Sequence, residues 1–217
     1  MLAQLGCRIV ELGHAERRAP PYNEDPAFIA QKIEAVVRGG MIPLICVGEK
    51  ERRELSPGDL PWQATAAAMY DVGPQVRGAL EAAYRGFKDA AVGASVRKAH
   101  IIFAYEPIWA IGAKEPAEAS YVCDVVHDIK EVVAEYLYEE DGEQDPETRQ
   151  DAIGDVRYLY GGSARPGTWE GLKGECDGLF LGRFAHEAKN FVDVVQEVGT
   201  SFLDEPTQEK QLEAIEP

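Results

Sequence analysis

The sequence of 217 residues predicts an α/β protein in which helices cover a parallel β-sheet. The first observation behind this class is that five short apolar runs are each followed by a helical segment. Such βα alternation places successive strands parallel to one another. The second observation is the composition, with 45% hydrophobic and 28% charged residues, which is typical of a folded globular chain. The pattern leaves open whether the sheet closes into a barrel or stays open and doubly wound.

Strands are predicted where apolar residues run together, and helices where apolar residues recur every three or four positions. The first strand ends at Gly13, and the first long helix begins at Pro26 and stops at Gly39-Gly40. The predicted strands are residues 8–12, 42–47, 100–104, 156–160 and 178–181. The predicted helices are residues 26–38, 62–70, 74–87, 117–138 and 187–198. Residues 139–150 are acidic and polar and predict a solvated loop.

These elements form one predicted domain, residues 1–199, followed by an acidic tail, residues 200–217, that is expected to be disordered. No run approaches the ~20 apolar residues of a membrane-spanning helix. The first strand carries Arg8 and Glu11, which argues against a secretory signal. We therefore expect a cytoplasmic protein. Its cysteines, which form no CxxC pair and predict no metal site, are expected to be reduced: Cys7, Cys46, Cys123 and Cys176.

The charge balance excludes two classes of partner. Acidic residues outnumber basic ones by 38 to 22, which gives a formal net charge of −16. Nucleic acids and anionic membranes are bound through Lys and Arg contacts to phosphate, and a strongly negative field repels both. Neither nucleic acid nor a membrane surface is therefore an expected partner.

The candidate catalytic residues follow predicted strands, because parallel α/β proteins place their sites beyond the carboxyl ends of the strands. Glu106 follows the third strand among apolar neighbours, and burial makes a carboxylate a stronger base. His14 follows the first strand and precedes a short helical turn, which favours a neutral ring. The alternatives are a capping or ion-paired carboxylate for Glu106 and a structural role for His14.

Glycines after the last two predicted strands indicate an anion site. Gly161-Gly162-Ser163 and Gly182 follow these strands, and glycines let backbone N–H groups approach an anion closely. The alternative is a pair of tight turns. Residues 108–116 are too apolar for an ordinary surface loop and predict a closing lid.

Four segments carry a resemblance to a known family. Residues 104–112 read Ala-Tyr-Glu-Pro-Ile-Trp-Ala-Ile-Gly, and residues 13–18 read Gly-His-Ala-Glu-Arg-Arg. Residues 46–49, Cys-Val-Gly-Glu, and 160–163, Tyr-Gly-Gly-Ser, match two further segments in the same order. Together they resemble the triosephosphate isomerase family, with Ala15 where the family has Ser. The resemblance extends from Met1 to about Val198.

The resemblance implies a TIM (β/α)8 barrel that acts as an aldose–ketose isomerase. The implied reaction interconverts dihydroxyacetone phosphate and glyceraldehyde 3-phosphate, in glycolysis and gluconeogenesis, through an enediol(ate). Glu106 would move the proton between adjacent carbons, neutral His14 would polarise the carbonyl, and Glu16 would support the site. The phosphate would be bound by backbone N–H groups of Gly112, Ser163 and Gly182. No metal or organic cofactor is implied, and the complete protein is expected to be a homodimer.

The chain departs from the family pattern in length. The family has three βα units before the histidine-bearing strand, and a (β/α)8 barrel takes roughly 250 residues. Only the last five βα units are therefore expected here, without the family's substrate-binding Asn and Lys or its dimerisation loop. The expected explanation is an N-terminally incomplete sequence. The alternative is a degenerate paralogue that binds phosphate without catalysis.

Two further departures concern the substrate. The lid reads Ile-Gly-Ala-Lys-Glu-Pro over residues 111–116, where the family usually has Ile-Gly-Thr-Gly. The last phosphate loop reads Gly182-Arg183 in place of Gly-Gly. This combination is similar to paralogues that isomerise tetrulose phosphates. Erythrulose 1-phosphate is therefore the alternative substrate, with the same type of reaction.

Overall fold

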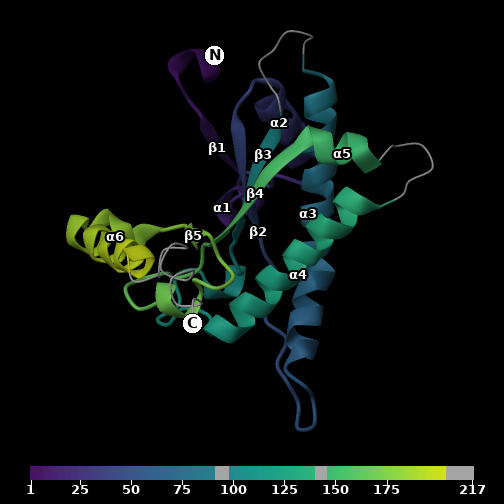
Figure 1. Cartoon of the computed structure of the whole chain (residues 1–217). Coiled ribbons are helices and arrows are strands. Elements are labelled where there is room, and N and C mark those ends of the chain that lie inside the picture. The colour runs from purple at the N-terminus through teal and green to yellow at the C-terminus, as the bar shows by residue number, and fades with distance from the viewer. Residues whose placement is uncertain (91–97, 140–145, 204–217) are drawn as a thin grey trace, which may run out of the picture.

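The computed structural model describes residues 1–90, 98–139 and 146–203, and within them five strands form one parallel sheet (Figure 1). The strands are β1 (Ile9–Leu12), β2 (Ile42–Val47), β3 (Ala99–Tyr105), β4 (Ile153–Tyr160) and β5 (Gly178–Leu179). The helices are α1 (Ala15–Arg18), α2 (Pro26–Arg38), α3 (Trp62–Lys88), α4 (Ala119–Tyr138), α5 (Pro146–Ala152) and α6 (Ala188–Leu203). Single 3-10 turns are η1 (Ala3–Leu5), η2 (Ile108–Ala110), η3 (Trp169–Gly171) and η4 (Arg183–His186).

Each strand lies beside the next one in the sequence, in the order β1-β2-β3-β4-β5. All four pairings are parallel, so every strand ends at the same edge of the sheet. The predicted α/β class and the parallel sheet are therefore confirmed. In the described residues the sheet is open, because β1 and β5 each pair with one neighbour only.

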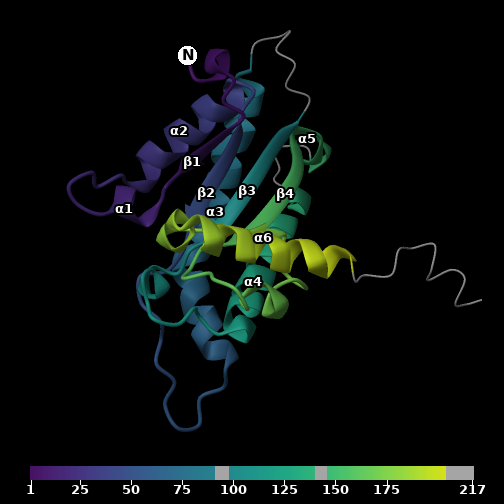
Figure 2. The same ribbon diagram turned by 90° about the vertical axis from the view of Figure 1, so that its left-hand side faces the viewer.

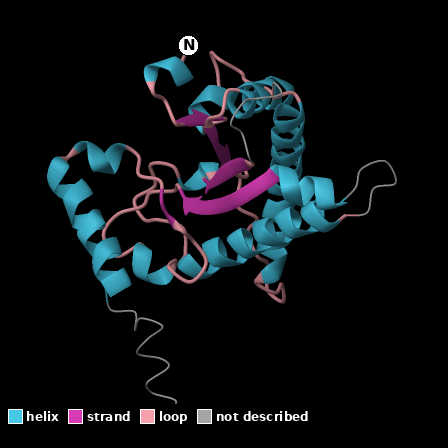
Figure 3. Cartoon of the chain, turned by 45° about the horizontal axis from the view of Figure 1, so that its top comes forward, coloured by secondary structure: helices cyan, strands magenta, loops and turns pink. Residues whose placement is uncertain are grey.

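One face of the sheet carries the core. Leu12, Ile45 and Phe103 lie side by side in the register and are at most 8% exposed. Helices α2, α3 and α4 cover this face, and α6 lies on the opposite side of the sheet (Figures 1 and 2). The next row of paired residues across the strands runs from Glu11 through Leu44 and Ile102 to Arg157. The side chains at its two ends, Glu11 and Arg157, are exposed. The curvature of the sheet away from its helical layer is visible in Figure 3.

Helix α3 differs from the sequence-based prediction of two helices, because it continues through Pro74. Proline removes a backbone donor and normally breaks a helix interior. Here Val72 and Val76 are fully buried on either side of it, so packing holds both halves in line. The side-chain amide of Gln75 donates to the carbonyl of Asp71 at 2.9 Å, which adds a hydrogen bond within the turn that contains the proline.

The prediction of a solvated loop over residues 139–150 is wrong in its second part, where α5 begins at Pro146. Arg149 on this helix is 3% exposed and donates to the carbonyl of Tyr136 at 2.8 Å, so it ties α5 to the end of α4. At the C-terminus, α6 continues to Leu203, beyond residue 200 where the tail is expected to begin. The rest of the expected tail, residues 204–217, lies outside the described residues.

Candidate active site

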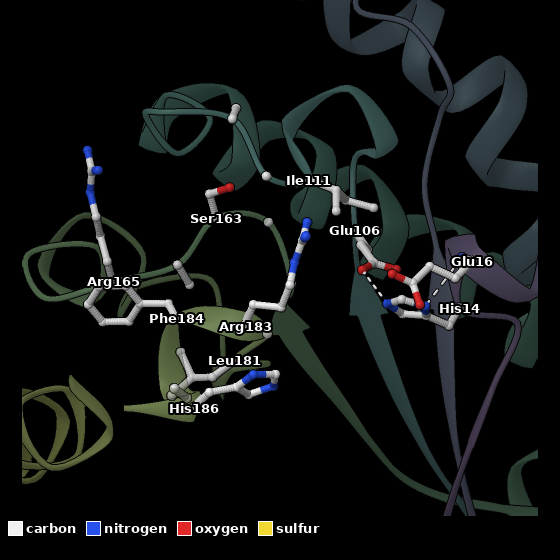
Figure 4. Close-up of a pocket in the computed structure, with 17 residues that line it drawn as sticks. His14, Glu16, Glu106, Ile111, Ser163, Arg165, Leu181, Arg183, Phe184 and His186 are labelled. Carbon is white, nitrogen blue, oxygen red and sulfur yellow. Dashed lines mark hydrogen bonds and ion pairs between the residues drawn. The ribbon is translucent and has the colours of Figure 1, made fainter. Parts of the chain in front are cut away.

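His14 and Glu106 meet at the carboxyl edge of the sheet, although 92 positions (106 − 14) separate them in the chain. His14 follows β1 and caps α1, while Glu106 directly follows β3. The His14 Nε2 atom lies 3.0 Å from the Glu106 Oε1 atom (Figure 4). Because β2 lies between β1 and β3, the two side chains reach across one strand to form this pair. The structure thus brings together the two residues predicted to be catalytic.

The hydrogen bonds of His14 define its tautomer. Its Nδ1 atom accepts a hydrogen bond from the backbone N–H of Glu16 at 3.3 Å, which requires an unprotonated Nδ1. In the neutral ring the single proton then resides on Nε2, and it points at Glu106. The exposed Glu16 thus acts on His14 through its backbone, and not through its carboxylate.

Glu106 is a buried carboxylate, only 5% exposed. Burial raises its pKa, while His14 and the backbone N–H of Ala15 oppose that effect. The net direction is upward, so this carboxylate is more basic than an ordinary glutamate. A neutral hydrogen-bond donor and a basic carboxylate 3.0 Å apart can hold and move a proton.

We expect Glu106 to titrate above the ordinary glutamate value of 4.5 in a 13C NMR titration of side-chain carboxyl groups. The signal is assigned by its loss in Glu106→Gln. Between the unfolded and the raised folded pKa, the folded state binds more protons, so ionisation of Glu106 lowers stability as pH rises. Glu106→Gln should therefore stabilise the protein at pH 7 more than at pH 4. A titration midpoint of Glu106 at or below pH 4.5 would contradict the raised pKa of this carboxyl group.

Arg18 fixes the positions of the strand ends beneath the pair. Its Nε donates to the carbonyl of Gly13 at 2.6 Å, and its Nη2 donates to the carbonyl of Cys46 at 2.9 Å. Gly13 directly follows β1 and Cys46 is the last residue but one of β2, so one guanidinium joins the carboxyl ends of two neighbouring strands. Because His14 directly follows Gly13, this contact also helps to fix the position of His14.

A pocket of about 680 Å³ opens beside the pair. All predicted site residues line it: His14, Glu16, Glu106, Gly112, Ser163 and Gly182. The pocket also contains residues of the predicted lid and of the loops after β4 and β5 (Figure 4). The segments after β1, β3, β4 and β5, which are distant in the sequence, therefore converge on one cavity.

Two glycines shape the walls of this pocket. A Cβ on Gly162 would lie 2.0 Å from the Tyr160 hydroxyl, which itself accepts a hydrogen bond from the N–H of Ala117. Only glycine permits this close approach of the loop. Gly112 has a φ of +71°, a left-handed conformation that favours glycine. Ser163 donates from its hydroxyl to the carbonyl of Ala110 at 2.8 Å, which joins the loop after β4 to the lid.

Glu49 anchors the start of the lid, a role that the sequence analysis missed. This carboxylate is 1% exposed and accepts hydrogen bonds from the hydroxyls of Tyr105 and Tyr121 and from the Trp109 indole, at 2.7–3.1 Å. Burial beside Glu49 raises the pKa of both tyrosines, so they remain donors. The sequence signal that could have identified it is the position of Glu49, which follows Gly48 at the end of the apolar run 42–47.

Replacing Glu49 by Leu is expected to lower the free energy of unfolding by about 3 kcal/mol, because two buried donors and one half-buried donor lose their acceptor at about 1–3 kcal/mol each. Urea denaturation measures this loss. The matched control is Glu118→Leu, an exposed carboxylate paired with Arg52, for which about 1 kcal/mol or less is expected. Equal losses in the two variants would contradict the anchoring role.

Within the described ranges, no three His, Cys, Asp or Glu side chains are grouped as metal ligands. No helix of the described part of the chain has the length and apolar character to cross a membrane. His186, for which the sequence indicated no role, lines the pocket as well.

This protein has a parallel sheet, and its His–Glu pair and glycine-shaped loops lie at the carboxyl edge of that sheet. These features define the class of α/β proteins whose ligand site lies beyond the strand ends. The family model of triosephosphate isomerase matches residues 1–198. The chain belongs to the triosephosphate isomerase family.

Curated relatives carry two different names. The L-erythrulose-1-phosphate isomerase of Pectobacterium atrosepticum is 35% identical over 200 residues, covering 92% of this chain and 64% of the relative. The L-erythrulose-1-phosphate isomerase of Brucella abortus is 36% identical over 204 residues, covering 92% and 66%. The triosephosphate isomerase of Rhodopirellula baltica is 33% identical over 204 residues, covering 90% and 66%. The chain thus spans 64–66% of the length of these relatives.

Proposed function

We propose that the chain carries the reaction site of an aldose–ketose isomerase acting on a small sugar phosphate. The observation that carries the proposal is the contact between the His14 Nε2 atom and the Glu106 carboxylate, which lie 3.0 Å apart in the lining of the pocket. Family membership supports the same reaction. Isomerisation between adjacent carbons needs one base and one donor to a carbonyl oxygen, and this pair supplies both.

In the proposed reaction, Glu106 removes a proton from the hydroxyl-bearing carbon next to the substrate carbonyl. The C–H electron pair forms the carbon–carbon double bond of an enediolate, and the former carbonyl oxygen takes the negative charge. The Nε2–H of His14 stabilises this oxygen by a hydrogen bond. After a proton moves between the two oxygens, Glu106 returns its proton to the neighbouring carbon. Glu16 supports the step by fixing the His14 tautomer through its backbone N–H.

Substrate binding is proposed to use the glycine-shaped loops. Backbone N–H groups of Gly112, Ser163 and Gly182 would donate to the phosphate, since all three residues line the same pocket as His14 and Glu106. The predicted lid, residues 108–116, would close over the substrate and exclude water. The contact of Trp109 with Glu49 supports a defined resting position for the start of this lid. A homodimer, as expected for the complete protein, is part of the proposal and is tested by sedimentation.

The substrate is proposed to be either dihydroxyacetone phosphate or L-erythrulose 1-phosphate. The names of the relatives include both activities, and most of the relatives compared are named L-erythrulose-1-phosphate isomerase. The deciding experiment measures kcat/KM for both ketose phosphates with the purified protein, because specificity is the ratio of these constants. A higher value for one substrate assigns the activity to it. Phosphate binding without turnover of either would favour the non-catalytic alternative.

A further inference from the structure

Arg183 is an exposed arginine on the loop after β5, immediately after Gly182. Within the described part of the chain, its guanidinium takes part in no hydrogen bond or ion pair. The side chain nevertheless lines the pocket that contains His14 and Glu106. Figure 4 shows it extending from the β5 loop into the space between Ser163 and Glu106. A free cation thus faces the cavity.

The second arginine of this pocket is arranged differently. Arg165 donates to the Lys114 carbonyl at 2.6 Å and forms an ion pair with Glu115. In Figure 4 its side chain points away from His14 and Glu106. Its charge is therefore already neutralised at the rim. Of the two arginines lining the described pocket, Arg183 is the one whose charge has no protein partner.

The Arg183 guanidinium also lies against the lid. Its Nη2 atom is 3.1 Å from the point that a Cβ on Gly112 would occupy. The group therefore stands between the turn of the lid at Gly112 and the loops after β4 and β5. An anion bound among these loops would meet the planar fork of Nη and Nε donors, which matches phosphate oxygens in pairs.

The negative charge of the protein increases the importance of Arg183 for the binding of an anion. With a net charge of −16, the chain repels anions in general, and Glu16 and Glu106 add negative charge to the pocket. Backbone N–H groups supply only partial charges, so a full positive charge beside them strengthens the binding of a dianion in such a site. Arg183 supplies this charge.

We propose that Arg183 binds the phosphate dianion of the substrate through a two-pronged ion pair beneath the lid. The identity of that substrate rests on the function proposed above. The contact between Arg183 and a phosphate group rests on the position of Arg183 in the pocket. Arg183 is then a binding residue that adds a full positive charge to the backbone donors of Gly112, Ser163 and Gly182.

The test titrates inorganic phosphate into the purified protein and follows the backbone N–H signals of Gly112, Ser163 and Gly182 by NMR, in wild type, Arg183→Met and Arg183→Lys. Met retains an unbranched side chain but removes the charge, so Kd is expected to rise about tenfold or more. Lys retains the charge without the fork, and an intermediate Kd is expected. The matched control is Lys189→Met on α6, an exposed lysine paired with Asp193, which should change Kd less than about twofold.

The outcomes separate this inference from the proposed function. The inference is overturned if wild type does not bind phosphate, or if Arg183→Met binds it as Lys189→Met does, even where ketose phosphates are isomerised. It is supported if phosphate affinity depends on Arg183, even where no ketose phosphate is turned over. Where turnover is present, Arg183→Met should also raise KM by a larger factor than it lowers kcat, as loss of a substrate contact requires.

Discussion

Replacing Glu106 by Asp is expected to slow isomerisation by about 10²-fold or more while KM changes little, since a shift of about 1 Å at a reacting group costs on that order. The shorter side chain draws the carboxylate back by about one methylene from the 3.0 Å contact with His14. The charge and the pocket remain, so substrate binding is preserved. Steady-state kinetics with the better of the two ketose phosphates measures the effect on kcat and KM separately.

Glu118→Asp is the control for this variant, because it makes the same change at an exposed carboxylate that does not line the pocket. We expect wild-type turnover from it. If Glu106→Asp also turned over at the wild-type rate, Glu106 would not be the base. Urea denaturation of both variants shows whether a loss of activity reflects a loss of folding.

Replacing His14 by Ala is expected to lower kcat by about 10²–10³-fold, the range found when one donor to a developing oxyanion is removed. The Nε2–H would no longer meet the substrate oxygen, and the Glu16 N–H would lose its acceptor. Glu106 would also lose its hydrogen-bond donor. Kinetics at several pH values measures the loss.

His127→Ala is the matched control, because His127 is an exposed histidine on α4 that does not line this pocket. We expect full activity from it. His14→Gln, whose amide can still donate, should recover part of the rate lost in His14→Ala. Equal activity in His14→Ala and His127→Ala would show that the imidazole does not act on the substrate.

The strand ends could be predicted from the sequence because local patterns specify them. The run 42–47 is apolar on both faces and is followed by Gly48, the run before Gly161 ends at a glycine as well, and the run 101–105 is apolar up to Glu106. Parallel order then places all following residues at one edge. His14 and Glu106 could therefore be expected to lie near each other, although their 3.0 Å contact could not.

Other features depend on tertiary contacts that no local pattern contains. Tyr105, Trp109 and Tyr121 come from a strand, a 3-10 turn and a helix, and only the packed structure brings them to Glu49. Helix α3 continues through Pro74 because buried valines on both sides outweigh the propensity of proline to end it. The orientation of the Arg183 side chain into the pocket likewise follows from the loops around it.

The most direct test of the proposed proton transfer is to run the isomerisation in D2O and to locate deuterium in the product by 1H NMR. Transfer through the Glu106 carboxylate lets the abstracted proton exchange with solvent, so deuterium is expected at the carbon that receives it. Glu106→Gln should abolish both turnover and incorporation. Turnover and deuterium incorporation by Glu106→Gln at the wild-type rate would contradict the role of Glu106 as the proton carrier.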